Sequence, residues 1–156
     1  MPTAAPPPTP PAFVSPAFVS PAFVSPVGES CITSPFGQRA LWVPIAGHSH
    51  PGIDLAAPLG TVVRAAAAGR VVGIRRLGLG GLYVVLDHGD GVRTLYAHLG
   101  LIAPPLAEGR TTVAAGQPLG RVGRTGKSFG PHLYFQVTVN GKPVDPEPLL
   151  GLKRCP

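Results

Sequence analysis

Short runs of alternating apolar and polar residues recur along the chain from about residue 60 onward. These runs are rich in β-branched residues and lie at Thr61–Ala65, Arg70–Ile74, Tyr83–Asp87, Arg93–Ala97, Gln117–Val122 and Leu133–Val139. Alternation with a period of two sends successive side chains to opposite faces of an extended chain. Each run therefore predicts a half-buried β-strand.

Turn-forming dipeptides separate these runs. Asp90-Gly91 and Asn140-Gly141 each stand between two alternating segments, and both are strong signals for a two-residue hairpin turn. The chain also holds 21 glycines and 21 prolines, which break helices, and no long amphipathic helix is predicted. We therefore expect an all-β fold, a compact domain of antiparallel sheet spanning residues 31–156.

Residues 1–30 have a different, low-complexity composition. A proline-rich opening is followed by three copies of Ala-Phe-Val-Ser-Pro, which end at Pro26. Proline at every fifth position forbids a helix or a central strand, so we expect a disordered, extended linker. An alternative is that Phe13, Phe18 and Phe23 contact a partner or a membrane surface.

The net charge of +6, with 13 basic and 7 acidic residues, predicts attraction to polyanions. The basic residues are scattered, with Arg75–Arg76 and Lys153–Arg154 as the adjacent pairs, and they lack the interleaved aromatics of a nucleic-acid site. We expect no nucleic acid as partner, and either a solvated basic surface or an affinity for an anionic wall polymer. No apolar stretch is long enough for a transmembrane segment, and no signal peptide is expected in the opening MPTAAPPPTP.

The two cysteines, Cys31 and Cys155, stand at the two ends of the predicted domain. A disulfide between them would close a loop of about 125 residues and stabilise the fold by ~4–5 kcal/mol in the chain-entropy model. Such a bridge requires an oxidising compartment. Two free thiols are the alternative.

One segment carries a candidate metal site. In His50-Pro51-Gly52-Ile53-Asp54 the proline and glycine favour an extended chain, which places His50 and Asp54 on one face and Ile53 on the other. An imidazole and a carboxylate on one face can bind a single zinc ion. The spacing also arises by chance, so a structural histidine and a turn aspartate are the alternative.

Further segments, read together with this one, resemble a known family. They are Phe36-Gly37-Gln38-Arg39, Gly60-Thr61-Val62-Val63, Tyr96-Ala97-His98-Leu99, Gly123-Arg124-Thr125-Gly126, Gly130-Pro131-His132-Leu133-Tyr134-Phe135 and Val144-Asp145-Pro146. In this order they resemble the LytM/lysostaphin-type zinc metalloendopeptidases, which cut the peptide cross-links of bacterial peptidoglycan. The resemblance implies the duplicated hybrid motif fold of that family, with long loops that form an open groove. It also implies a periplasmic or extracellular location at the cell envelope.

The resemblance implies a role for each matching residue. His50 and Asp54 match the first two zinc ligands, while His98 and His132 match the two catalytic histidines. The third zinc ligand of the family is a histidine two residues after His132, and this chain has Tyr134 there. The expected cofactor is one Zn²⁺, bound weakly or not at all, and the expected partner is a peptidoglycan stem or cross-link peptide.

Tyr134 is a doubtful ligand for physical reasons. A phenol reaches farther than an imidazole nitrogen, and with a free pKa of about 10 it is neutral at pH 7. Three explanations are open: Tyr134 is an unusual oxygen ligand, His48 replaces it, or the site is metal-free. In the last case the domain would bind peptidoglycan or regulate a partner cell-wall hydrolase.

Positions are also predicted for three other residues. Arg39 is expected to line the groove and bind substrate carboxylates. Tyr96, two residues before His98, is expected either in the groove wall, where it would bind substrate, or in the core. His88, next to the Asp90-Gly91 turn, is expected to be structural.

Overall fold

The computed structural model describes residues 23–38, 49–77, 81–123 and 131–156. The expectations for the proline-rich opening up to residue 22, for Arg39 and for His48 lie outside these described residues.

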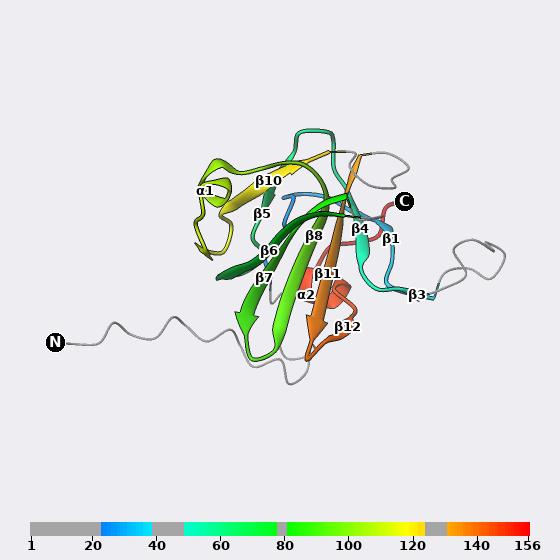
Figure 1. Ribbon diagram of the computed structural model, residues 1–156. Coiled ribbons are helices and arrows are strands. Elements are labelled where there is room, and N and C mark those ends of the chain that lie inside the picture. The colour runs from blue at the N-terminus through cyan, green and yellow to red at the C-terminus, as the bar shows by residue number, and fades with distance from the viewer. Residues whose placement is uncertain (1–22, 39–48, 78–80, 124–130) are drawn as a thin grey trace.

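One large antiparallel sheet forms the body of the molecule, and three of its long strands, β7 (Gly81–Gly89), β8 (Val92–Ile102) and β11 (His132–Val139), run side by side in Figure 1. The order across the sheet is β1 (Ile32–Ser34), β4 (Ile53–Ala56), β11 (His132–Val139), β8 (Val92–Ile102), β7 (Gly81–Gly89), β6 (Gly69–Leu77) and β9 (Thr112–Val113). Every one of these neighbouring pairs is antiparallel. The all-β prediction is confirmed.

Shorter elements complete the sheet and cover its ends. They are β5 (Val62–Arg64), β10 (Pro118–Val122) and β12 (Lys142–Val144) in the same sheet, the pair β2 (Gly37–Gln38) and β3 (Ser49–His50), and the helices α1 (Pro104–Ala107) and α2 (Glu147–Leu150). The six predicted strands correspond to β5, β6, β7, β8, β10 and β11. Within the described ranges, the helices are too short to cross a membrane.

The two predicted hairpin turns are present. Asp90 and Gly91 have φ values of 52° and 80°, and Asn140 and Gly141 have 51° and 81°. Positive φ at both central positions is the geometry that joins twisted antiparallel strands with two residues. The turns also contact each other, because the amide of Asn140 donates to the Gly91 carbonyl at 2.9 Å.

The core lies under one face of the sheet, and the alternation on β4 and β11 decides which side chains reach it. Ile53 and Leu55 of β4, and Leu133, Phe135 and Val137 of β11, are each 0% exposed. The residues between them, including Asp54 on β4, are half-buried on the opposite face. The sequence therefore separates a packing face from a polar face on adjacent strands.

Residues 23–26, the described part of the third Ala-Phe-Val-Ser-Pro repeat, contact the folded domain, which therefore begins before the boundary predicted at residue 30. Phe23 is only 3% exposed, and its ring packs edge-on against Phe135 with centroids 6.4 Å apart. Backbone hydrogen bonds from Phe23 to Leu149 and from Val24 to Ala66 fix this segment. A buried aromatic side chain outweighs the linker-like composition around it, so this phenylalanine fills the core instead of contacting a partner.

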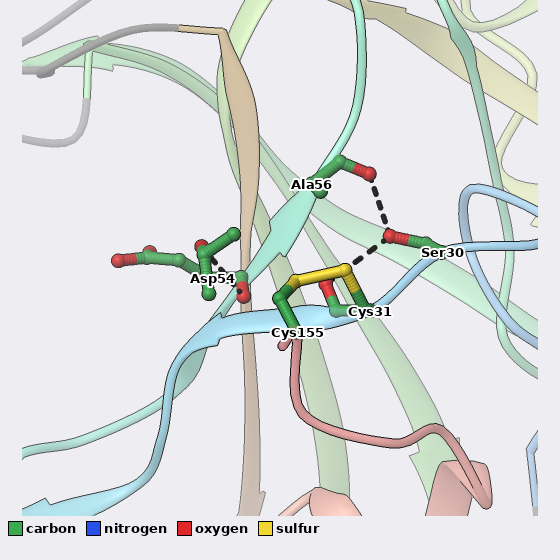
Figure 2. Close-up of a disulfide and its surroundings, with 6 residues drawn as sticks. Ser30, Cys31, Asp54, Ala56 and Cys155 are labelled. Atoms are coloured by element: carbon green, nitrogen blue, oxygen red, sulfur yellow. Dashed lines mark hydrogen bonds between the residues drawn. A yellow bond between two sulfur atoms is a disulfide. The ribbon is translucent and has the colours of Figure 1, made fainter.

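Cys31 and Cys155 form the predicted disulfide, with Cα atoms 4.9 Å apart. Figure 2 shows the bridge between the start of β1 and the C-terminal segment, beside β4. Next to it the Ser30 hydroxyl donates to the Ala56 carbonyl at 2.5 Å. The C-terminal segment is therefore tied to the start of β1, next to the strand that carries Asp54.

Candidate functional site

The polar face of β4 and β11 brings the predicted site residues together. Strand alternation puts His132, Tyr134 and Gln136 on the face of β11 opposite to the core. Asp54 of β4 stands directly across from Tyr134 in the strand register. The pairing of two strands thus positions the carboxylate beside side chains that are 78 or more residues away in sequence.

Asp54 lies between two histidines. Its Oδ2 atom is 3.8 Å from His50 Nε2, and its Oδ1 atom is 3.5 Å from His132 Nε2. Each of these distances is longer than a hydrogen bond and close to the separation of about 3.4 Å between two ligands of one tetrahedral zinc ion with bonds near 2.1 Å. The arrangement leaves room for a small group beside the carboxylate.

His50 is held in one tautomer. Its Nδ1 atom lies 2.9 Å from the Pro35 carbonyl oxygen, and since a carbonyl only accepts, this nitrogen carries the proton. The lone pair of a neutral ring is then on Nε2, the atom that faces Asp54. A carbonyl that orients the far nitrogen of a histidine is a common support for a metal ligand.

His98 enters the site through an irregularity in β8. Between the pairs Leu82–Leu99 and Val84–Tyr96, β8 has one residue more than β7, and His98 has a φ of 64°. A bulge with left-handed backbone redirects a side chain and is concentrated at functional sites. The His98 ring is 8% exposed and lies 4.9 Å, centroid to centroid, from the ring of His132.

Tyr134 lies within this cluster, but its hydroxyl is bound elsewhere. Its ring centroid is 5.6 Å from that of His50 and 6.4 Å from that of His98. The hydroxyl donates to Gln136 Oε1 at 2.8 Å. The phenol therefore extends along β11 in the direction away from His132.

Gly52 makes room for the phenol. A Cβ atom at this position would lie 2.8 Å from both Cζ and the hydroxyl oxygen of Tyr134, and 2.5 Å from the Phe135 carbonyl oxygen. Any side chain here would collide with the backbone and with the tip of the ring. The glycine between His50 and Asp54 thus forms a cradle for Tyr134.

These residues fit a zinc ion at two of the three protein positions. The His50 nitrogen and the Asp54 carboxylate are donors that zinc accepts, whereas Tyr134 offers a hydroxyl that keeps its proton and donates a hydrogen bond to Gln136 Oε1. Among the described residues, no three His, Cys, Asp or Glu side chains are grouped so that they could hold a metal. As the side chains lie, the site does not offer the three-residue set of a catalytic zinc centre.

A pocket of about 630 Å³ opens beside the carboxylate. Asp54, His132, Glu29, Thr33 and Pro58 are among the residues that line it. It provides a space next to the two histidine–carboxylate contacts in which a bound chain could lie.

Tyr96 lies in the core, which is one of its two expected positions. Its ring is 0% exposed, and its hydroxyl accepts from the Ala66 amide at 3.0 Å and shares a 2.8 Å hydrogen bond with Thr94. Complete burial raises the pKa of this phenol above its usual value, against the opposing effect of those two hydrogen bonds. The bulge at His98 separates the two rings, because it breaks the two-residue alternation that would put both on one face.

His88 is structural, as expected. It is 5% exposed, and its two ring nitrogens lie 2.8 Å from the Ala68 carbonyl and 2.7 Å from the Thr94 hydroxyl. Burial lowers the pKa of His88 from its usual value of 6.5, although the Ala68 carbonyl and the charge of Asp87 act in the opposite direction. The ring is therefore a neutral part of the core.

Two contributors to the site were not identified from the sequence. Gln136 could have been found from its position two residues after Tyr134 on the same strand face. The Pro35 carbonyl could not have been found, because no sequence pattern predicts which backbone oxygen will contact a histidine 15 residues later.

Comparison with known proteins gives a consistent family. The sequence profile of Peptidase family M23 matches residues 48–146. The DD-carboxypeptidase/endopeptidase Mpg of Neisseria meningitidis is 46% identical over 115 residues, which cover 74% of this chain and 26% of that protein. The murein hydrolase activator EnvC of Escherichia coli is 40% identical over 100 residues, covering 64% of this chain and 23% of that protein. The chain spans about a quarter of the length of these curated relatives.

Solved structures agree with this result. A zinc-containing peptidase from Vibrio cholerae superposes with a TM-score of 0.69 at 35% identity, over 78% of this chain and 38% of that one. The catalytic domain of lysostaphin from Staphylococcus simulans superposes with a TM-score of 0.68 at 32% identity, over 78% of this chain and 92% of that one. The likeness therefore extends over the sheet that carries the site.

Proposed function

Because the chain belongs to peptidase family M23, we propose that it is a peptidoglycan-directed endopeptidase-type domain. Its substrate would be a peptide cross-link of the bacterial cell wall, and hydrolysis would require zinc. The relatives named as endopeptidases support this proposal, and so does the zinc in one structural neighbour.

One observation carries the proposal. A carboxylate and three histidines from β3, β4, β8 and β11 converge on one face of the sheet, with Asp54 at 3.5 Å and 3.8 Å from two of the imidazoles. Two members of this group of ionisable side chains, Asp54 and His132, line a pocket. This combination is typical of a hydrolytic site.

Each residue has a proposed task. His50 and Asp54 would hold the ion, and the chemistry that zinc supplies when bound is polarisation of the scissile carbonyl and acidification of the attacking water. Of the two adjacent imidazoles, His98 would accept the proton of that water, and His132 would donate one to the leaving amine. Their ring separation of 4.9 Å allows both to reach one peptide bond.

A location in the cell envelope follows from the substrate, and two features of the chain support it. The disulfide between Cys31 and Cys155 persists in oxidising compartments outside the cytoplasm. The net charge of +6 favours contact with an anionic wall.

The proposal is tested by release of soluble muropeptides from purified sacculi in excess zinc. We expect the native chain to release them, and we expect Asp54→Asn and an added chelator to reduce release to background. Asp87→Asn, which removes a carboxylate that pairs with Arg93 on the surface, is the matched control and should leave release unchanged. Absence of release by the native chain in excess zinc would contradict the enzymatic function.

A second candidate function is a peptidoglycan-binding module that regulates another cell-wall hydrolase. The protonated Tyr134 hydroxyl, which donates a hydrogen bond to Gln136, favours it, because a neutral phenol is a weaker zinc ligand than a histidine nitrogen. The similarity to a protein named as a murein hydrolase activator also favours it. This candidate predicts binding to sacculi without release, and faster release when a partner hydrolase is added.

A further inference from the structure

We infer that Cys31 and Cys155 are positioning residues for the candidate site, because their disulfide fixes β1 and β1 holds the site's first two residues. Those two residues are His50 and Asp54. Their chemical task rests on the proposed function, whereas the structural link from the disulfide to them does not depend on it.

The C-terminal segment covers one edge of β1. The Ile32 amide donates to the Lys153 carbonyl at 2.8 Å, and the Cys155 amide donates to the Ile32 carbonyl at 2.9 Å. The disulfide joins the same segment to Cys31, one residue before the strand begins. Because short terminal segments fray unless they are tied down, the covalent bond keeps this segment on β1.

The other edge of β1 lies on the strand that carries the carboxylate. Ser34 is paired with Asp54 in the strand register. The Thr33 hydroxyl donates to the Asp54 carbonyl at 3.2 Å, and the Ala56 amide donates to the Cys31 carbonyl at 3.0 Å. Figure 2 shows this succession from the C-terminal segment through β1 to Asp54 on β4. A displacement of β1 therefore reaches the backbone of Asp54.

The residues that follow β1 hold the histidine. The Pro35 carbonyl accepts from His50 Nδ1 at 2.9 Å, and the Ser34 hydroxyl lies 3.5 Å from the same nitrogen. Two residues further on, Gly37 of β2 is paired with His50 of β3. One continuous stretch, residues 31–37, thus runs from the disulfide to the contacts that fix the tautomer of His50.

The disulfide stands where a reductant can reach it. Both cysteines are half-buried, and Cys31 lines the pocket together with Asp54 and His132. Once the bond is broken, the C-terminal segment is free to fray, and β1 is held along β4 alone. The expected consequence is local, because the buried strands keep their packing while residues 31–37 lose their fixed position.

Histidine ring nitrogens report this link without any hydrolysis assay. Two-bond ¹H–¹⁵N spectra of the metal-free protein distinguish protonated from unprotonated ring nitrogens, and they are recorded before and after reduction by a water-soluble phosphine. The phosphine takes an oxygen from water and becomes its oxide, while the two sulfurs take up two protons and become thiols. We expect His50 to lose its Nδ1–H pattern on reduction. We expect His88, whose Nδ1 faces the Ala68 carbonyl in the core, to keep its own.

A matched variant and an activity measurement complete the experiment. The double variant Cys31→Ser, Cys155→Ser should show the reduced pattern of His50 from the start and should not respond to the phosphine. Muropeptide release by the reduced native chain should be at least about tenfold slower than by the oxidised chain, because a misplacement of about 1 Å can cost about 100-fold in rate.

Two results would overturn the inference. One is that His50 keeps its Nδ1–H pattern after reduction. The other is that the His88 pattern changes together with that of His50, since this would show a general loss of the fold. If the oxidised native chain releases no muropeptides while His50 still responds to reduction, the enzymatic proposal alone fails.

Discussion

At the scale of single residues, two histidines of this chain illustrate how surroundings determine a role. His50 has its Nδ1 proton fixed by the Pro35 carbonyl, and its other nitrogen faces a carboxylate beside the pocket. His88 has both nitrogens engaged by Ala68 and Thr94 inside the core. The first arrangement leaves a lone pair for a ligand, and the second leaves a neutral ring that supports packing.

Neutral burial of His88 makes stability depend on pH. Because burial lowers its pKa in the folded chain, the unfolded chain binds a proton more readily once the pH falls through about 6.5. The contribution is therefore fully present above pH 6.5 and is lost progressively below it. We expect the free energy of unfolding in urea to decline less between pH 7.5 and 5.5 for His88→Gln than for the native chain. Equal declines for the two proteins would contradict the assignment of His88 as a neutral, buried ring.

At the scale of elements, the strands and hairpins were predictable and the site's departures from regularity were not. Alternating runs located six of the strands, with the end of β8 five residues beyond its predicted end, since burial of one sheet face enforces the period. The extra residue near His98 breaks that period, so Tyr96 does not share a face of β8 with His98 as regular alternation would require. Phe23 was assigned to a linker because local proline content outweighs a single aromatic side chain in a sequence pattern.

The two hairpin turns offer an element-scale prediction. Gly91 and Gly141 have nearly the same φ, 80° and 81°, but a Cβ at Gly91 would lie 2.0 Å from Asn140 Oδ1 whereas none lies near Gly141. Alanine should cost about 1–2 kcal/mol of backbone strain at either position. Overpacking should add ~1 kcal/mol or more at Gly91 alone. Urea unfolding of both variants measures the difference, and equal losses would show that the turns do not pack against each other.

At the scale of the whole molecule, the disulfide and the buried Phe23 tie both ends of the described chain to the fold. The bridge spans 124 residues of separation and stabilises the fold by ~4–5 kcal/mol in the chain-entropy model. It borders the same strand edge as Asp54, so the closure of the chain also supports the site (Figure 2). The cysteine positions were readable from the sequence, whereas the pairing of β1 with β4 beside them required the structure.

The family resemblance identified His50, Asp54, His98 and His132, which the structure brings together. It left the role of Tyr134 open. Spacing alone could place Tyr134 on the correct face of β11, but it could not show that Gln136 and Gly52 hold the phenol. Those contacts depend on a side-chain torsion and on the register of β4 against β11. Whether the domain acts as an enzyme or as a binding module therefore depends on side-chain geometry that cannot be read from the sequence.

The most direct test of the account compares muropeptide release from sacculi by the native chain and by Tyr134→His at limiting zinc. The account predicts at least about tenfold faster release by Tyr134→His, because a histidine would restore the third nitrogen ligand. It also predicts equal binding of the two proteins to sacculi. Release by Tyr134→His that is no faster at any zinc concentration would contradict the assignment of this position to the metal site.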